Sequence, residues 1–118
     1  MECIFCQIAA KKAKAEIIYE DGETMVFQNI RPLAPIHLLI IPKKHIVSIA
    51  HILPEESNLI GQVIITAQKA AQLVGLAERG YKLAVNVGQG GGQEIFHLHF
   101  HLLGGWLSNE ERDIPGQP

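Results

Sequence analysis

Several features that define whole classes of protein are scarce or missing in this sequence of 118 residues. The longest apolar run, residues 36–42, is interrupted by His37 and is far shorter than the ~20 apolar residues of a membrane-spanning helix. The chain begins with the acidic Glu2, and no apolar segment follows a basic stretch, so we expect no secretory signal peptide. A formal net charge of −2 argues against the basic face of a protein that coats nucleic acids. We therefore expect a protein that binds neither membranes nor nucleic acid.

Cysteine is scarce as well, since the sequence holds only Cys3 and Cys6. A disulfide framework spreads its cysteines along the chain, so this close pair indicates a reducing compartment and predicts a cytoplasmic location. The pair can be half of a zinc site or a redox pair, but a thioredoxin-like redox motif belongs in a β-α-β setting that is absent here. A zinc site needs two further ligands, for which His45, His51 and His97 are available.

The spacing of apolar residues predicts a single α+β domain over residues 1–118, with a tail over 106–118 that has no usable period. Asp21-Gly22 marks a turn, and Pro54 and Gly75 mark the ends of a long helix. Short links between strands favour antiparallel pairing, so we expect an antiparallel meander sheet of about five strands with one long and one short helix. The predicted elements are a short helix over 4–14, strands over 16–20, 24–29 and 37–42, the long helix over 59–74, and strands over 81–87 and 94–103.

The most specific pattern is His97, His99 and His101, which alternate with apolar residues at 98, 100 and 102. In a strand the three imidazoles share one face, and His97 and His101 lie ~13 Å apart, too far to ligate one metal together. A central imidazole kept neutral by its neighbours can attack phosphorus and form a covalent nucleotidyl-histidine, while the flanking rings move protons. The alternative is a polar strand face with solvated histidines.

A glycine-rich segment, residues 88–92, comes shortly before these histidines. Unhindered backbone N–H groups in such a loop can form a nest for a phosphate. The lysine and hydroxyl of a P-loop are absent, so the alternative is a plain connecting loop.

Two segments resemble a known family. Residues 91–105, which read GGQEIFHLHFHLLGG, are similar to the signature of the histidine-triad family, and residues 35–46 resemble the segment that supplies its fourth histidine. Of the branches of this family, the chain is most similar to the Hint nucleoside phosphoramidases. The resemblance implies a HIT-like fold, a homodimer whose subunits share an extended sheet, and hydrolysis of purine nucleoside 5′-monophosphate conjugates of the adenosine 5′-phosphoramidate type.

The resemblance also implies roles for single residues. His99 would be the nucleophile, with His37, His97 and His101 around it. The implied substrate-binding residues are Ile4, Phe5, Ile8, Phe27, Asn29, Ile30, Asn86, Gln93 and Glu94. The apolar members of that set also fit a core role, and for Ile8 and Ile30 the core role fits at least as well. Asn29 stands where many Hint proteins carry an aspartate for the ribose, and Glu94 where some carry a serine that serves the leaving group.

Members of the family with a similar cysteine pair bind structural zinc, which implies a site made of Cys3, Cys6, His45 and His97. Catalysis would not require this metal. Two alternative functions stay open at this point. One is a dinucleoside polyphosphate hydrolase or nucleotidyl transferase, which Asn29 leaves open, and the other is a non-catalytic interaction protein that binds nucleotides or zinc.

Overall fold

An antiparallel sheet forms the centre of the computed structural model, which describes residues 3–113. Its five strands are arranged in the order β1-β2-β3-β5-β4. The strands are β1 (Ile17–Glu20), β2 (Thr24–Gln28), β3 (Ile36–Pro42), β4 (Lys82–Val85) and β5 (Phe100–Gly104). The predicted antiparallel α+β architecture is therefore confirmed. The strand order departs from a simple meander, because β5 lies between β3 and β4.

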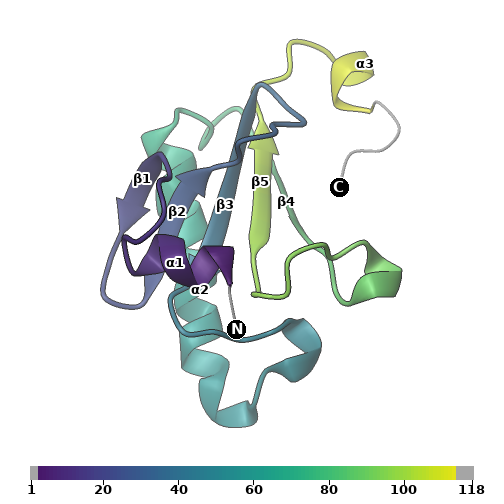
Figure 1. The fold of residues 1–118 in the computed structure, drawn as a ribbon. Coiled ribbons are helices and arrows are strands. Elements are labelled where there is room, and N and C mark those ends of the chain that lie inside the picture. Colours follow the sequence, from purple (N-terminus) through teal and green to yellow (C-terminus); the bar gives the residue numbers. More distant parts are fainter. Residues whose placement is uncertain (1–2, 114–118) are drawn as a thin grey trace.

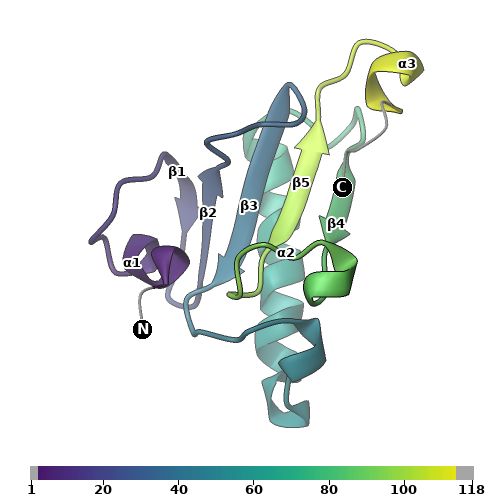
Figure 2. The same cartoon turned by 45° about the vertical axis from the view of Figure 1, so that its right-hand side comes forward.

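Helices cover both faces of this sheet. The long helix α2 (Ser57–Leu73) lies behind it and the short helix α1 (Ile4–Ala9) in front of it (Figures 1 and 2). Two separate apolar clusters fill the two interfaces. Because side chains alternate along a strand, β3 sends Leu38 and Ile40 toward α2 and Leu39 and Ile41 toward α1. Burial on both faces makes β3 the central strand of the fold.

Local chemistry sets the boundaries of several elements. The carboxylate of Asp21 accepts hydrogen bonds from the backbone N–H groups of Glu23 and Thr24, at 2.9 and 2.8 Å, which closes the predicted turn between β1 and β2. The short 3-10 helices η1 (Ile49–His51) and η2 (Pro54–Glu56) lead into α2. Gly75, at φ 78°, follows the end of α2, as predicted, because glycine adopts the left-handed conformation without strain.

Several predicted elements are longer than those observed, and the strand predicted over 81–87 spans only Lys82–Val85. The first helix ends at Ala9, not at 14, and Lys11 has a φ of 63°. The last strand begins at Phe100, not at 94. Residues before Phe100 turn away from the sheet because the backbone N–H of Leu98 donates to the carbonyl of Ile46, at 2.6 Å.

The tail contains a helical turn that the apolar pattern did not indicate. Helix α3 (Asn109–Arg112) begins after Ser108, whose hydroxyl accepts from the backbone N–H of Glu111 at 3.2 Å. The rest of the predicted tail, 114–118, lies outside the described residues. Among the helices within 3–113, none has the length and apolar character needed to cross a membrane.

Candidate active site

The three histidines of the signature lie on the α1 side of the sheet, although only His101 belongs to β5. The rings of His99 and His101 have centroids 5.1 Å apart, and the edge of Phe5 on α1 meets the ring of His99 at the same distance. Leu98 and Phe100 point the other way, into the cluster beneath α2. The predicted alternation of faces therefore holds, even where the chain is not a regular strand.

One ring nitrogen of His99 is hydrogen-bonded to the protein backbone. Its Nδ1 lies 2.8 Å from the backbone carbonyl oxygen of His97. A carbonyl oxygen only accepts, so Nδ1 carries the proton and Nε2 keeps its lone pair. The side chain is 8% exposed. Burial lowers the pKa of His99 from its ordinary value, which its bond to His97 offsets only in part. At neutral pH His99 is an uncharged imidazole with a defined basic nitrogen.

His37 of β3 and His101 of β5 form a hydrogen-bonded pair, with 2.9 Å between Nε2 of His37 and Nδ1 of His101. The backbone N–H of Leu33 donates to Nδ1 of His37 at 3.0 Å. His37 therefore carries its proton on Nε2 and donates it to His101, whose own proton lies on Nε2. Burial, together with the charges of His99 and His37, lowers the pKa of His101 to about 4. Burial likewise lowers the pKa of His37.

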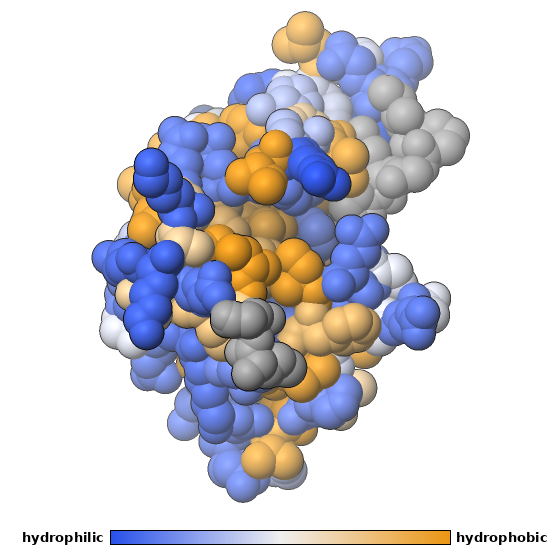
Figure 3. Space-filling model, viewed as in Figure 1, coloured by the Kyte–Doolittle hydropathy of each residue, from blue (hydrophilic) through white to orange (hydrophobic). Residues whose placement is uncertain are grey.

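The predicted apolar residues divide into three that are buried and two that are exposed. Phe5 and Phe27 are 4% and 3% exposed, and their rings pack edge to face with centroids 5.3 Å apart. Ile4 and Ile30 are 45% and 88% exposed, so the core role is wrong for Ile30. Ile8 is buried in the cluster beneath α1, which matches the core role. Hydrophobic surface gathers at the centre of the face that carries α1, with hydrophilic residues around it (Figure 3).

The glycine-rich segment is held in place by side-chain amides. It contains the 3-10 turn η3 (Gln89–Gly91), with φ values of 72° at Gly88 and 86° at Gly92 that favour glycine. The amide of Gln93 accepts from the N–H of Gly88 at 2.9 Å and donates to the carbonyls of Val47 and Ile95, at 2.7 and 3.0 Å. Asn86 donates to the carbonyl of Gly91 at 2.9 Å. Both side chains shape the loop, which presents backbone N–H groups of residues 88–92 near the histidines as predicted for a phosphate contact.

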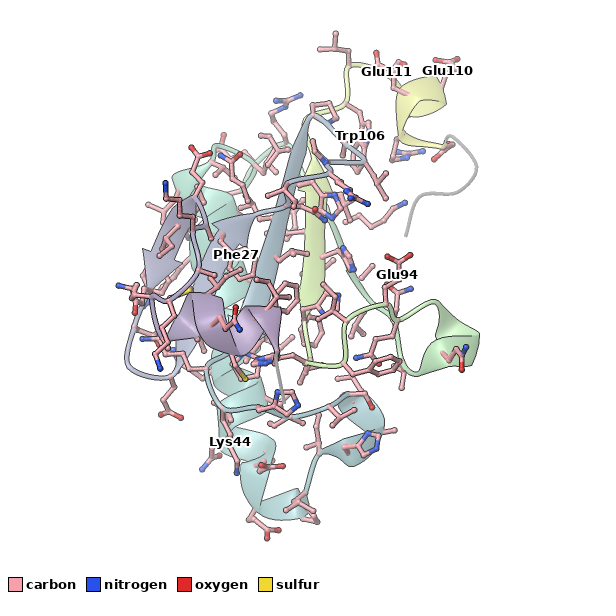
Figure 4. The ribbon with its side chains drawn as sticks, viewed as in Figure 1. Phe27, Lys44, Glu94, Trp106, Glu110 and Glu111 are labelled. Carbon is pink, nitrogen blue, oxygen red and sulfur yellow. The ribbon has the colours of Figure 1, made fainter. Side chains whose placement is uncertain are left out.

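Asn29 and Glu94 lie on opposite sides of the histidines. The Nδ2 atom of Asn29, just after β2, is 3.4 Å from Nε2 of His37. Glu94 is exposed and lies on the β4 side of β5, whereas Phe27 lies on the β2 side (Figure 4).

Four of the predicted metal ligands come together. The ligand atoms of Cys3, Cys6, His45 and His97 all lie within 4.8 Å of one another, so these residues could hold a metal ion. The Sγ of Cys6 is 3.2 Å from Nδ1 of His45 and 3.5 Å from Nδ1 of His97. Nε2 of the fully buried His97 donates to the carbonyl of Pro42 at 2.8 Å, which leaves the lone pair of Nδ1 facing the sulfur atoms. The donor set therefore fits a tetrahedral metal.

His51, the remaining candidate ligand, lies apart from this cluster. It is exposed, and its Nδ1 is 2.7 Å from the hydroxyl of Ser48. His51 is therefore a surface residue that flanks the long helix, and it is not part of the candidate metal site.

A hollow lies beside residues 105–112, on the edge of the sheet formed by β4. Its lining includes Arg79, Lys82, Trp106 and Arg112. The Nζ of Lys82 lies 5.9 Å from the centre of the Trp106 ring, and Arg79 donates to the Trp106 carbonyl at 3.3 Å. Arg112 is paired with Asp113 at 2.8 Å. This basic, aromatic hollow is formed by two segments distant in sequence, 79–82 and 105–112, so no local sequence pattern indicated it.

The family of the chain follows from comparison with known proteins. The model of the HIT domain matches residues 10–106, which span the sheet, α2 and all four clustered histidines. The chain belongs to the HIT family. Protein HitA of Neisseria gonorrhoeae is 50% identical over 102 residues, which cover 86% of this chain and 94% of that protein.

Solved structures of HIT proteins share this fold. A HIT family hydrolase from Legionella pneumophila is 50% identical, with a TM-score of 0.86 and coverage of 89% of this chain and 94% of the other. A Zn-bound histidine triad family protein from Mycobacterium smegmatis is 34% identical, with a TM-score of 0.77 and coverage of 93% and 79%. A histidine triad nucleotide-binding protein from Candida albicans is 29% identical, with a TM-score of 0.79 and coverage of 91% and 84%.

Proposed function

We propose that this HIT protein hydrolyses purine nucleoside 5′-monophosphate conjugates, of the adenosine 5′-phosphoramidate type, through a covalent intermediate on His99. The observation that carries the proposal is the bond from Nδ1 of His99 to the carbonyl of His97, which leaves Nε2 as a nucleophile of fixed direction. The names of related proteins, a hydrolase and a nucleotide-binding protein, agree with this reaction class.

In the first step the lone pair on Nε2 of His99 attacks the phosphorus. The bond from phosphorus to the leaving nitrogen breaks, its electron pair goes to that nitrogen, and the group departs as an amine after taking one proton from solvent. Nε2–H of His101 donates to a phosphoryl oxygen and stabilises the negative charge that develops there. His99 keeps its proton on Nδ1 throughout.

In the second step a water molecule attacks the phosphorus of the nucleotidyl-histidine. The bond to Nε2 breaks, the electron pair returns to His99, and the proton that the water loses replaces the one consumed before. The products are the amine and a nucleoside monophosphate. His97, whose ring faces the cysteines, would position His99 through its carbonyl instead of touching the substrate.

The surrounding residues suit such a substrate. Phe5 and Phe27 offer apolar ring surface for a base, with Ile4 and Ile30 at the exposed rim. Asn29 can bind a ribose hydroxyl, and the backbone of the loop 88–92 can bind phosphate. Glu94 would face the leaving group on the β4 side of the site.

We also propose that Cys3, Cys6, His45 and His97 bind structural zinc. Two thiolates and two imidazoles form a closed tetrahedral set for this ion, and a related protein is zinc-bound. The metal would crosslink α1, the segment after β3 and the segment before β5, and would supply no step of the reaction. Its effect on His99 would pass through His97.

A homodimer in the cytoplasm completes the proposal. Strand β4 ends the sheet and leaves Leu83 37% exposed. A second subunit could pair with such an edge and extend the sheet.

A second candidate function, dinucleoside polyphosphate hydrolysis, is favoured by the hollow beside β4. Lys82 pairs with Leu103, and Leu103 pairs with His37, so all three lie in one row on the same face of the sheet. A polyphosphate on His99 would extend toward Lys82, and its second nucleoside toward Trp106. Under this alternative, Arg79→Gln lowers kcat/KM for a diadenosine polyphosphate and leaves the phosphoramidate unaffected.

The test is steady-state hydrolysis of adenosine 5′-phosphoramidate by the parent, His99→Ala and His51→Ala. We expect turnover by the parent and by the His51 control, whose histidine lies outside the site, and none by His99→Ala. If the well-folded parent cleaves only diadenosine polyphosphates, the second candidate is correct. If it cleaves neither but binds nucleotides with and without His99, the protein is a non-catalytic binding module.

A further inference from the structure

The hydrogen bonds of the His37–His101 pair all run in one direction. The N–H of Leu33 points at Nδ1 of His37, and Nε2–H of His37 points at Nδ1 of His101. Each ring accepts at Nδ1 and donates at Nε2, so the pair is complete with two protons.

A third proton has no favourable position on this pair. Placed on Nδ1 of His37, it would oppose the N–H of Leu33. Placed on Nδ1 of His101, it would face the Nε2–H of His37. If the His37 proton then moved from Nε2 to Nδ1 of the same ring, it would face the N–H of Leu33. Protonation of the pair therefore costs a hydrogen bond wherever the proton is placed.

Asn29 contacts this pair at its shared proton. The Oδ1 atom of Asn29 accepts from the N–H of Arg31 at 2.9 Å, which fixes the orientation of the amide. Its Nδ2 therefore faces Nε2 of His37 at 3.4 Å. Two donors meet at this contact, so it is not a hydrogen bond, and the amide hydrogens present positive partial charge to the pair. A carboxylate of the same shape would present an acceptor with negative charge.

We propose that Asn29 is a positioning residue for the proposed hydrolysis: as an uncharged amide it adds no negative charge beside the His37–His101 pair, so that burial and the hydrogen bonds of the pair keep it uncharged and His101 remains a neutral Nε2–H donor beside His99. The inference rests on the proposed function for its role in catalysis, but its effect on the two histidines exists in the free protein. A ribose contact by Asn29 is a separate property.

The other neighbours of the pair act in the same direction. Within residues 3–113, the charges that act on His37 or His101 come from imidazoles: each is affected by His99, and His101 also by His37. These charges are positive when present, and they disfavour a further proton. The ring of His99 lies 5.1 Å from that of His101, so a cationic pair would in turn weaken the basicity of the nucleophile.

The substitution Asn29→Asp tests the inference because it changes charge without changing shape. Histidine titrations followed by NMR on the free protein measure the pKa values of His37 and His101 directly. We expect Asn29→Asp to raise the apparent pKa of the pair by about one unit or more, and Asn29→Ala to produce no comparable rise. Asn58→Asp, on the exposed start of α2, adds the same charge away from the site and serves as the matched control.

Kinetics connect this result to the reaction. In Asn29→Asp the acidic limb of the kcat profile should move to higher pH with the titration of the pair, whereas a role limited to ribose binding would change KM alone. Unchanged pKa values for His37 and His101 in a folded Asn29→Asp variant would overturn the inference. If the NMR shift occurs but no variant hydrolyses nucleotides, the proposed function fails and the inference about Asn29 stands.

Discussion

The carbonyl oxygen of His97 lies 2.8 Å from Nδ1 of His99, while the ring of His97 faces Cys3 and Cys6. One residue therefore joins the two proposed sites, because its imidazole belongs to the set of four candidate metal ligands and its backbone orients the proposed nucleophile. A change that moves the His97 ring should therefore also change the orientation of the His99 ring.

Loss of the proposed zinc site should lower both the stability and the activity of the protein. In Cys6→Ser the thiolate that contacts both His45 and His97 is gone, so we expect zinc content to fall and Tm to drop by at least about 5 °C. Activity should fall as well, since His97 loses its anchor. Metal analysis by mass spectrometry and thermal unfolding check this expectation. A variant with the parent's Tm and no zinc would show that the four residues do not form a structural site.

Stability should rise with pH through the range in which His101 titrates. The pKa of His101 is about 4 in the folded protein, against the ordinary histidine value of 6.5 expected in the unfolded chain. Between these two pH values the unfolded chain therefore binds more protons than the folded protein. The contribution of His101 to the free energy of unfolding is fully present above about pH 6.5 and is lost as the pH falls toward 4. Over this range the free energy of unfolding changes by up to about 1.4 kcal/mol per pH unit.

Urea denaturation between pH 4.5 and 7.5 measures that slope. The variant His101→Asn should show a shallower slope than the parent, whatever its absolute stability. His51→Asn, at an exposed site, should retain the parent slope. Equal slopes for the parent and His101→Asn would contradict the buried, neutral state of His101.

Gln93 should matter for stability more than its neighbour Gln89. The amide of Gln93, 4% exposed, bonds to backbone groups of Gly88, Val47 and Ile95. Gln93→Ala leaves these groups without their partner, so we expect a loss of about 1–3 kcal/mol in the free energy of unfolding and a lower kcat/KM. Gln89 is exposed on the same loop, and Gln89→Ala should cost less than about 0.5 kcal/mol. Similar losses in the two variants would contradict this role.

Replacing two glycines by alanine should change the free energy of unfolding in opposite directions. A Cβ at Gly104, in β5, would lie 2.7 Å from Cδ1 of the fully buried Leu76, so Gly104→Ala should destabilise the protein by about 1–3 kcal/mol. At Gly61, inside α2, a Cβ meets nothing within 4 Å, and Gly61→Ala should stabilise by about 0.5–1 kcal/mol. Chemical denaturation compares them. A Gly104→Ala variant as stable as the parent would show that Leu76 can move aside.

The sequence predicted the side chains of the site better than the backbone around them. Alternation placed His99 and His101 on one face and Leu98 on the other, because apolar burial controls which way each residue points. The strand boundary was wrong because residues before Phe100 bond to Ile46, which is distant in sequence. The backbone groups that fix the tautomers, from Leu33 and His97, carry no signal in the residue types.

Other differences have their own causes. The position of β5 between β3 and β4 depends on long-range pairing that no local pattern specifies. Helix α3 did have a signal, since Ser108 followed by Glu111 has the spacing of a capping box. The set of four candidate metal ligands was expected from the resemblance to zinc-binding relatives. The structure confirms that these four residues lie close together.

The most direct test of nucleotidyl transfer through His99 is to locate the covalent intermediate. The parent is mixed with adenosine 5′-phosphoramidate, quenched within one turnover under conditions that preserve phosphohistidine, digested and mapped by mass spectrometry. We predict an adenylyl group on the peptide that contains His99, assigned to that residue by fragmentation, and no adduct in His99→Ala. An adduct on another residue, or full turnover by His99→Ala, would contradict the mechanism.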